Sequence, residues 1–452
     1  MYKRRLVVKK TIPVVYASDD NFLKQTFVSI YSVLSNRIND YYLSFYIFIP
    51  EGCKEEKYDV NWAFKDYCIQ YVRVSTGYFQ DVNMVIQNIT KPTFYRLLIP
   101  MFLKSLDSCI YLDGDTICCA DISELFDVEL GNNLLAASIG ARITFNAEEI
   151  SKILEIPSAK NYINAGVLLM NLSLMRNEGM VDTFIKYSFA GFPCQDQDVL
   201  NKCCFGRIKI LPLKFNVYAN VYSMPLNMLS NKFSVAELED AIDRPVIIHY
   251  PREYSKPWKN KMCAKGKEWW NYASKALSND ILLDLEQETK KWEKEYSYQN
   301  LFDKVECSQK IVIFGFSEVG CSVCDEIDDR YPNRIIAFCD NDIRKKGKMY
   351  KGYRVIDVEK LKWDYHDVLV VITSQNYSKL IQKQLVEMGF LRDNLVIYRK
   401  KTLNYIYSFD KDYWAKMWKD IVIDDISTKE CLNSGISEIE KYIYNNFWGK
   451  EE

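Results

Sequence analysis

Short apolar runs alternate with longer stretches of helical periodicity along most of the chain. The runs Thr11–Ala17, Tyr42–Pro50 and Ser108–Leu112 each have the length of a β-strand, and residues 20–36 carry apolar positions at helical spacing. Strands separated by helices are typical of a largely parallel sheet covered on both faces. The pattern therefore predicts an α/β fold for the first part of the chain.

The same alternation continues and then begins again further along. In the first part it predicts a helix at 93–104 and further strands at 68–74, 163–172, 208–212 and 245–249. In the second part it predicts helices at 322–330 and 376–388 and strands at 310–314, 334–339, 368–373 and 394–398. A second, smaller α/β unit is therefore expected.

These patterns divide the chain into four parts. Residues 1–275 are predicted to form the first α/β domain, 276–307 a charged helical linker, 308–400 the smaller domain, and 401–452 a helical, aromatic-rich tail. We expect the tail to bury its aromatic residues against the protein or another copy, which allows a homo-oligomer. Loose peripheral contact with an anionic membrane is the alternative.

Composition narrows the class of protein. Hydrophobic residues make up 48% and charged residues 26% of the 452 residues, as in soluble globular proteins. The net charge of −1 gives no reason to expect a nucleic-acid partner. No apolar run approaches the roughly 20 residues of a membrane span. The 14 cysteines lack the spacing of a zinc site and suit free thiols, so a cytoplasmic location is expected.

Two carboxylates stand directly after the apolar run Ser108–Leu112. Asp113 and Asp115 are separated by Gly114, which lets the backbone turn without a side-chain clash. Together the two side chains could reach one hard cation such as Mg²⁺ or Mn²⁺, and such an ion can neutralise a departing diphosphate. The competing interpretation is a solvated acidic loop.

Three further segments favour the metal site. His249 is one of only two histidines and ends the strand predicted at 245–249, where the alternative is a core histidine. Lys256 lies shortly after it, and the alternative there is an exposed loop lysine. Asp196 and Gln197 belong to a polar segment that could equally be the first turn of a helix.

Six motifs in this order make the chain resemble the family 8 glycosyltransferases, retaining enzymes that include lipopolysaccharide galactosyltransferases and glycogenin. The resemblance covers residues 11–259, and its motifs lie at 15–22, 95–97, 111–115, 164–167, 196–198 and 249–258. It implies a nucleotide-sugar-binding domain of the GT-A type, followed in this chain by the smaller α/β domain.

The resemblance also implies roles for individual residues. The metal ligands would be Asp113, Asp115 and His249. The residues contacting the donor would be Ala17, Asp19, Asn21, Phe22, Arg96, Gly114, Asn164, Ala165 and Gly166. The catalytic group would comprise Gln197, Asp196 and Lys256, with Lys256 stabilising the leaving diphosphate and the amide oxygen of Gln197 supporting an oxocarbenium-like transition state.

The implied reaction is a metal-dependent hexosyl transfer that retains the anomeric configuration. The cofactor would be Mn²⁺ or Mg²⁺, the donor a UDP-sugar carrying glucose or galactose, and the acceptor a bacterial glycan, glycolipid or glycoprotein. Two features depart from the family pattern. Arg252 stands where a glycine is usual and Lys256 comes one residue late, while the stretch 137–144 offers Gly140 or Arg142 in place of an acidic residue. The second departure leaves the donor sugar open.

The smaller domain carries a motif of its own. Gly315 and Gly320 frame a turn after a strand that resembles a degenerate dinucleotide-binding turn, with Ser317 in place of its middle glycine. Asp340 ends the next strand, where an acid could bind a ribose. With the stretch 338–342, these residues resemble the Rossmann-like, nucleotide-sugar-binding modules of bacterial sugar enzymes.

Two alternatives to a glycosyltransferase follow from this second domain. One is a nucleotide-sugar epimerase or oxidoreductase, which Ser317 weakens because the middle glycine lets a pyrophosphate approach the backbone. The other is a non-catalytic nucleotide-sugar-binding scaffold, which the intact set of Asp113, Asp115 and His249 argues against.

Overall fold

The structure is a computed structural model, and it describes most of the chain between residues 9 and 398. The described residues are 9–54, 62–82, 84, 90–140, 147–223, 233–251, 255–261, 263–296, 298–365, 367–374 and 377–398. The predicted tail at 401–452, Arg142 and Arg252 lie outside them.

The described residues fall into two compact units. The first continues to Pro257 and includes Lys261–Asp284, whereas the second contains Trp258–Asn260 and continues from Leu285. The segment predicted as a helical linker holds α11 (Asn279–Tyr296) and α12 (Tyr298–Cys307).

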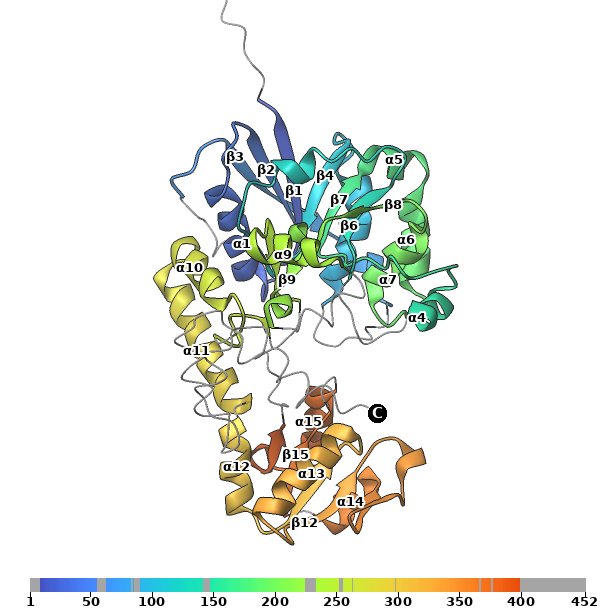
Figure 1. The fold of residues 1–452 in the computed structure, drawn as a ribbon, viewed down its shortest axis with the longest axis vertical. Coiled ribbons are helices and arrows are strands. Elements are labelled where there is room, and N and C mark those ends of the chain that lie inside the picture. The colour runs from blue at the N-terminus through green and yellow to red at the C-terminus, as the bar shows by residue number, and fades with distance from the viewer. Residues whose placement is uncertain are drawn as a thin grey trace, which may run out of the picture. The chain divides into compact units, whose positions relative to one another are not determined.

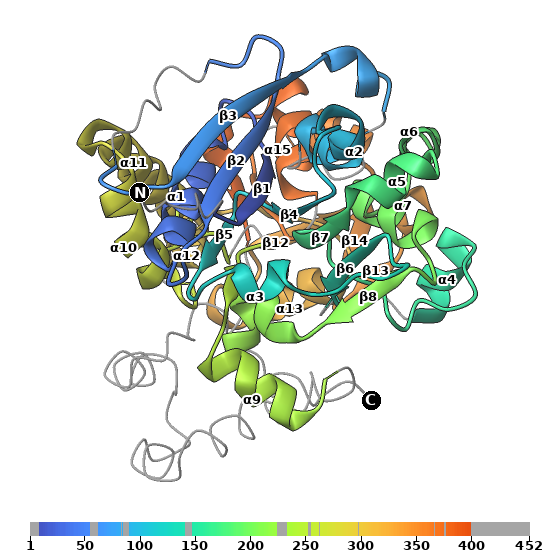
Figure 2. The same ribbon diagram turned by 90° about the horizontal axis from the view of Figure 1, so that it is seen from above.

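A seven-stranded sheet in the order β3-β2-β1-β4-β7-β6-β8 forms the centre of the first unit (Figures 1 and 2). Every strand runs parallel to the others except β7, so the prediction of a largely parallel sheet is confirmed with one exception. The strands are β1 (Thr11–Ala17), β2 (Tyr42–Pro50), β3 (Tyr67–Val74), β4 (Ser108–Leu112), β6 (Leu135–Ser138), β7 (Val167–Asn171) and β8 (Ile208–Leu211).

The reversed direction of β7 decides which residues meet at the edge of the sheet. Its antiparallel register pairs Leu112 with Val167, and the N–H of Asp113 donates to the carbonyl of Gly166 at 2.8 Å. The start of β7 therefore lies beside the end of β4, whereas a parallel partner would place its own end there.

Helices cover both faces of the sheet. On one face Val15 belongs to a buried apolar cluster with Leu97, Phe184 and Leu200. On the other face Tyr16 hydrogen-bonds a serine of α1 at 3.0 Å. The helices of this unit are α1 (Leu23–Ser35), η2 (Thr76–Phe79), η3 (Lys91–Leu98), α2 (Ile99–Phe102), α3 (Ser123–Phe126), α4 (Ala147–Leu154), α5 (Leu172–Asn177), α6 (Met180–Ser188), α7 (Gln195–Cys203), η4 (Leu213–Phe215), η5 (Ala219–Ser223), α9 (Val235–Asp243) and α10 (Gly266–Ala276).

The helix predicted at 93–104 differs from the structure. A 3₁₀-helix, η3, leads into the single turn of α2, with Pro92 near the start of the first and Pro100 near the start of the second. Proline is tolerated in the first turn of a helix, as at Pro92, but in a helix interior it lacks the N–H and clashes with the preceding turn, so the regular helix predicted at 93–104 is interrupted at Pro100.

A small second sheet completes the first unit. It has the order β5-β10-β9, made of β5 (Thr116–Cys118), β10 (Ile247–His249) and β9 (Val217–Tyr218). In its register His249 pairs with Thr116 on one side and with Tyr218 on the other. This pairing brings the histidine back to the turn that follows β4.

The second unit contains a six-stranded sheet in the order β13-β14-β12-β11-β15-β16, in which only β13 is antiparallel to its neighbour. Helices pack on both faces, α12 and α13 on one and α14 and α15 on the other. Its elements are β11 (Ile311–Phe314), α13 (Glu318–Arg330), β12 (Ile335–Cys339), η7 (Ile343–Lys345), β13 (Met349–Tyr350), β14 (Tyr353–Ile356), α14 (Val358–Asp364), β15 (Leu369–Ile372), α15 (Ser378–Glu387), η8 (Arg392–Asn394) and β16 (Leu395–Ile397). The unit is α/β, and its classification as Rossmann-like stays a prediction.

The turn between β11 and α13 is held by Asp340, which follows β12. Asp340 accepts from the N–H of Phe316 at 2.8 Å and from Lys345 at 2.9 Å. Gly315 has a φ of +118°, and Gly320 approaches it so closely that an added Cβ would lie 2.0 Å from the Gly315 carbonyl oxygen. Glycine is therefore required at both positions.

Two other expectations concern the whole chain. Among the described residues no helix is long and apolar enough to span a membrane. No disulfide links two cysteines in the described part of the chain.

The close approach at Gly320 gives a test of the second unit. We expect Gly320→Ala to destabilise this unit by about 1–3 kcal/mol, because overpacking against backbone cannot be relieved by a rotamer change. Hydrogen exchange followed by mass spectrometry should show faster exchange in β11 than in the unmodified protein. In the control Gly77→Ala the new Cβ lies 3.6 Å from its nearest neighbour. Equal exchange in β11 for all three proteins would contradict the packing argument.

Candidate active site

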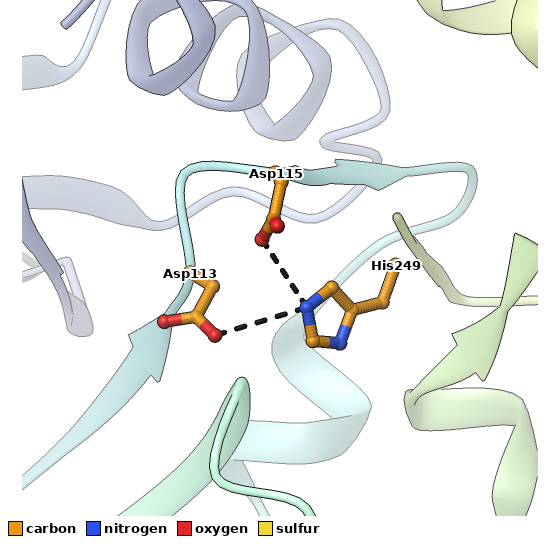
Figure 3. A group of neighbouring side chains, drawn as sticks. All are labelled: Asp113, Asp115 and His249. Atoms are coloured by element: carbon orange, nitrogen blue, oxygen red, sulfur yellow. Dashed lines mark ion pairs between the residues drawn. The ribbon is translucent and has the colours of Figure 1, made fainter. Parts of the chain in front are cut away.

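Three predicted metal ligands converge where the two sheets of the first unit meet (Figure 3). His249 Nε2 lies 3.2 Å from Asp115 Oδ1 and 3.7 Å from Asp113 Oδ2. One ligand atom from each residue falls within 4.8 Å of the others, and this group stands alone as a possible metal site in the described part of the chain. The prediction that these three residues form one cluster is confirmed.

The local backbone explains why they meet. Asp113 follows β4, and the N–H of Tyr250 donates to the carbonyl of Asp115 at 2.9 Å as an extension of the β5–β10 pairing. The hydroxyl of Thr116 closes the turn by donating to the Asp113 carbonyl at 2.8 Å.

Gly166 borders this cluster so tightly that no side chain fits. A Cβ at this position would lie 2.2 Å from His249 Cε1 and 2.8 Å from Asp113 Oδ2. Gly114 is confined in the same way, since an added Cβ there would lie 2.5 Å from Thr26 Oγ1 and 3.1 Å from the Phe22 ring. Gly166 thus lets the backbone approach the imidazole and the carboxylate of Asp113, and Gly114 lets the turn between the two acids pack against Thr26 and Phe22.

The donor set fits a divalent cation. Two carboxylates and one imidazole are ligands that Mn²⁺ accepts, whereas Mg²⁺ favours oxygen ligands alone. Asp113 keeps about a quarter of its side chain exposed, while Asp115 and His249 are buried. The cluster is therefore open to a ligand mainly on the Asp113 side.

Arg96 holds Asp113 from behind. Its guanidinium is buried and donates to Asp113 Oδ1 at 2.7 Å, to the Ala165 carbonyl and to Thr93. The same guanidinium pairs with Asp196 Oδ2 at 3.0 Å. Arg96 thus donates to side chains and a carbonyl of the protein itself. Its contact with a donor, which the family resemblance implies, stays a prediction.

Asp196 is a buried acid with an unusual pKa. Burial raises the pKa of Asp196 to about 6, and this effect outweighs the opposing charge of Arg96 and the hydrogen bond from Thr93. Two carboxylates share one guanidinium here, since Arg96 also serves Asp113. Asp196 therefore contacts the arginine that binds Asp113, and it is not one of the three clustered side chains.

Lys256 reaches the metal cluster although it comes one residue late in its motif. Its ammonium lies 2.5 Å from Asp115 Oδ2 and donates to the Tyr250 carbonyl at 3.1 Å. Burial would raise the pKa of Asp115, but the charges of Lys256 and His249 outweigh it and hold that pKa below its ordinary value. The lysine also lies 5.4 Å from the centre of the Phe22 ring.

The loop after β1 lies next to this lysine. Asp19 accepts from the N–H groups of Asn21 and Phe22 at 3.0 and 3.2 Å, which shapes the turn before α1. The Phe22 ring faces Gly114 and Lys256, whereas Asn21 is exposed. Ala17 ends β1 at the same edge. Binding of a uridine by this loop stays a prediction.

A row of amide side chains lies behind His249. Asn216 Oδ1 lies 3.0 Å from His249 Nδ1, and its amide nitrogen donates to Asn164 Oδ1 at 2.9 Å. Asn164 in turn donates to Gln197 Oε1 at 2.8 Å, and Gln197 donates to the hydroxyl of Tyr162 at 2.9 Å.

Sequence reasoning missed several residues that contact the predicted ones. Asn216 holds the ring of His249, Tyr111 donates to Asp113 at 2.9 Å, and Thr93 donates to Asp196 at 2.8 Å. Tyr111 and Thr93 stood inside or beside recognised motifs, so their polar groups were visible there. Asn216 carried no signal in the sequence, because its role depends on the pairing of β9 with β10.

Comparison with known proteins identifies the class. Residues 13–262, more than half of the chain, match Glycosyl transferase family 8. The chain therefore belongs to glycosyl transferase family 8, as its motifs indicated. Residues 307–396 match a second family, described as C2185-like, N-terminal.

Individual relatives agree with this assignment. A protein of Haemophilus influenzae is 29% identical over 213 residues, which are 46% of this chain and 63% of that protein. Glycosyltransferase GlyB of Streptococcus pneumoniae is 26% identical over 60% of this chain and 64% of its own length. The chain thus spans slightly less than two thirds of these two relatives.

A solved structure shows the same fold. The galactosyltransferase LgtC, determined in complex with donor and acceptor sugar analogs, has a TM-score of 0.51 and 22% identity. The match covers 59% of this chain and 97% of LgtC. The GT-A-like fold predicted for the first unit is therefore confirmed.

The space at Gly166 provides a test of the metal cluster. We expect Gly166→Ala to weaken Mn²⁺ binding at least about 10-fold, because the new methyl group displaces His249 or Asp113. Titration of Mn²⁺ followed by electron paramagnetic resonance measures this affinity. In the matched control Gly140→Ala the nearest atom would be 3.4 Å away, and the affinity should stay as in the unmodified protein. Unchanged binding in Gly166→Ala would contradict the proposed position of the ion.

The raised pKa of Asp196 predicts a pH dependence of stability. Its pKa is about 6 when folded and about 4 when unfolded, so only the folded state holds this proton in between. The contribution to stability is complete below about pH 4 and is lost as the pH rises through about 6. Urea denaturation at several pH values measures the free energy of unfolding. As the pH rises over this range, that free energy for Asp196→Asn should increase by about 1–3 kcal/mol relative to the unmodified protein. The exposed control Asp182→Asn should show a flat difference, and the same flat result for Asp196→Asn would refute the shift.

Proposed function

We propose that the chain is a metal-dependent, retaining glycosyltransferase that transfers glucose or galactose from a UDP-sugar to a bacterial glycan, glycolipid or glycoprotein. The observation that carries this proposal is the cluster of Asp113, Asp115 and His249, whose ligand atoms lie within 4.8 Å of one another. The cluster lies inside the segment that matches family 8.

The proposed ion is Mn²⁺ in preference to Mg²⁺, because one of the three ligands is an imidazole. Asp113, Asp115 and His249 would hold it, and when bound it would neutralise the charge that develops on the leaving diphosphate. The opening on the Asp113 side is where the diphosphate would approach.

Lys256 supports the same chemistry. Its ammonium already lies within 2.5 Å of a ligand carboxylate and close to the Phe22 ring. A cation in this position can pair with a phosphate oxygen of a donor whose base rests on Phe22. We therefore assign Lys256 to the stabilisation of the leaving group.

Gln197 is proposed to face the donor sugar. Its amide oxygen accepts from Asn164 at 2.8 Å and from the N–H of Ala165 at 3.2 Å. An amide oxygen has two lone pairs, and both are engaged here. Gln197 can stabilise a positively charged sugar through this oxygen only after one of the two bonds is released, so its rotation is part of the proposed transfer.

The donor and acceptor classes rest on named relatives. The Lipopolysaccharide 1,2-glucosyltransferase of Escherichia coli is 26% identical over 60% of this chain, and the Lipopolysaccharide 1,3-galactosyltransferase of Salmonella typhimurium is 28% identical over 54%. These names favour a hexose donor and a surface-glycan acceptor. A cytoplasmic location, peripheral membrane contact and a homo-oligomer are part of the same proposal. The second unit is proposed as a Rossmann-like module that positions the acceptor or mediates assembly.

Removal of a ligand carboxylate tests the proposed function. Asp113→Asn and Asp115→Asn should each lower the rate of UDP release from a panel of UDP-sugars by at least about 100-fold, because an anionic ligand worth several kcal/mol in the transition state is lost. Chelation of the unmodified protein should have the same effect, and Mn²⁺ should restore the rate. The exposed Asp182→Asn serves as the control.

The product gives a second measurement in the same experiment. NMR coupling constants of the new linkage should show the α configuration of the donor. Full turnover in the presence of excess chelator, or a β-linked product, would overturn the proposed mechanism.

A further inference from the structure

A continuous row of hydrogen-bonded side chains leads from α7 to the imidazole of the metal cluster. It begins at a carboxylate, passes through a phenol and three amides, and ends at a ring nitrogen. Its members are Asp198, Tyr162, Gln197, Asn164, Asn216 and His249. Because every member is at least partly buried, water does not readily replace these partners, and the direction of each bond matters.

Two backbone groups fix the direction of the amides. The N–H of Ala165 donates to Gln197 at 3.2 Å, and the N–H of Gly166 donates to Asn164 at 3.0 Å. A backbone N–H is only a donor, so the side-chain atom facing it must be an oxygen in both residues. The amide nitrogen of Asn164 therefore points to Gln197, and its oxygen points to Asn216.

The direction set at Asn164 passes on to the histidine. The group of Asn216 that faces the Asn164 oxygen must be a donor, which makes it the amide nitrogen, 2.9 Å away. The remaining atom of Asn216 is an oxygen and lies 3.0 Å from His249 Nδ1. An oxygen can only accept, so Nδ1 must carry a proton.

The consequence appears on the other side of the ring. When the ring binds an ion, the ion takes the lone pair of one nitrogen, and a proton on Nδ1 leaves that lone pair on Nε2. Nε2 is the atom that faces Asp115 and Asp113, at 3.2 and 3.7 Å. The amide row thus selects the tautomer that a metal ligand at this position requires.

We infer that Asn216 is a positioning residue for the metal cluster: anchored through Asn164 to the N–H of Gly166, it holds His249 in the Nδ1–H tautomer with Nε2 directed at the cation. The inference deepens the proposed function and rests on it where the cation is concerned.

The competing explanation is that Asn216 only fills space in the core. Asn201 allows a matched comparison, because it is another asparagine of the same unit with similar burial, 3% against 1% exposed for Asn216. Its side chain bonds the backbone of Ile163 and the carbonyl of Gln197 and does not contact His249. A loss of packing or of a buried hydrogen bond should therefore affect Asn201→Leu as much as Asn216→Leu.

The test uses the full-length protein labelled with ¹⁵N-histidine. The chain has only two histidines, so a His366→Gln sample assigns the two rings. Long-range ¹H–¹⁵N spectra, recorded with diamagnetic Zn²⁺ bound, report which ring nitrogen carries the proton and which one binds the ion, whereas without an ion the carboxylates of Asp115 and Asp113 would themselves accept a proton from Nε2. We expect Nδ1–H in the unmodified protein, in Asn201→Leu and in Asn216→Asp, whose carboxylate still accepts from Nδ1. Asn216→Leu should shift the population towards Nε2–H.

Metal affinity provides the second measurement. Mn²⁺ titrations should show Asn216→Leu binding about 10–100-fold more weakly than the unmodified protein, as is usual when the partner of a ligating histidine is lost. Asn201→Leu should stay within about threefold of the unmodified protein, well below that loss. Asn216→Asp keeps an acceptor for Nδ1 but loses the donor to Asn164, so its affinity should lie between those of the unmodified protein and Asn216→Leu.

Three outcomes would overturn the inference. They are an Nε2–H ring in the unmodified protein, unchanged tautomer and affinity in Asn216→Leu, and an equal loss of affinity in Asn201→Leu. If Asn216→Leu does not fold, the tautomer of the unmodified protein and of Asn216→Asp still decides the matter. A protein with the expected tautomer and Mn²⁺ affinity but no turnover of any UDP-sugar would refute the proposed function and leave this inference standing.

Discussion

The carboxylates of Asp113, Asp115 and Asp196 lie in one small region of the first unit. Their negative charges repel one another, so the site depends on positively charged partners. Asp113 and Asp115 lie close together in the cluster with His249, while Asp196 pairs with Arg96, which also binds Asp113. Arg96 forms ion pairs with Asp113 and Asp196, and Lys256 forms one with Asp115. A buried charge without a partner costs several kcal/mol, so the two cations are as necessary to the folded site as the acids themselves. The raised pKa of Asp196 shows where the compensation is incomplete.

The sequence indicated Asp113, Asp115 and His249 as candidates because strand ends are visible in it. Asp113 follows an apolar run and His249 closes another, but His249 reaches Asp113 through the small sheet β5-β10-β9, which the sequence did not reveal. The direction of β7 was not visible, because a fully buried strand reads as the same apolar run in either orientation. The contact of Gly166 with His249 follows from that direction and could not be predicted. Asn216 escaped notice for a similar reason, since a two-residue strand positions it.

Prediction of the secondary structure succeeded and failed for equally physical reasons. The strands Thr11–Ala17, Tyr42–Pro50 and Ser108–Leu112 were predicted with the bounds that the structure shows. Long apolar runs bounded by polar turns leave few alternatives. The helix predicted at 93–104 divided because its apolar periodicity concealed the effect of Pro100, which removes a backbone donor. In the second unit the alternation of strands and helices revealed the sheet. The sequence did not reveal that Asp340, the candidate ribose-binding acid, accepts a hydrogen bond from the glycine turn itself.

The forked hydrogen bonding of Arg96 has a consequence for how such a chain can diverge. Its planar group joins Asp113, Asp196 and the Ala165 carbonyl, positions that are remote in the sequence. The ammonium of lysine has three donors on one compact charge but lacks the planar fork that spans these three acceptors, so a change at position 96 is expected to accompany a change at one of the acids. Lineages that keep this arrangement should therefore alter positions 96, 113 and 196 jointly or leave them unaltered.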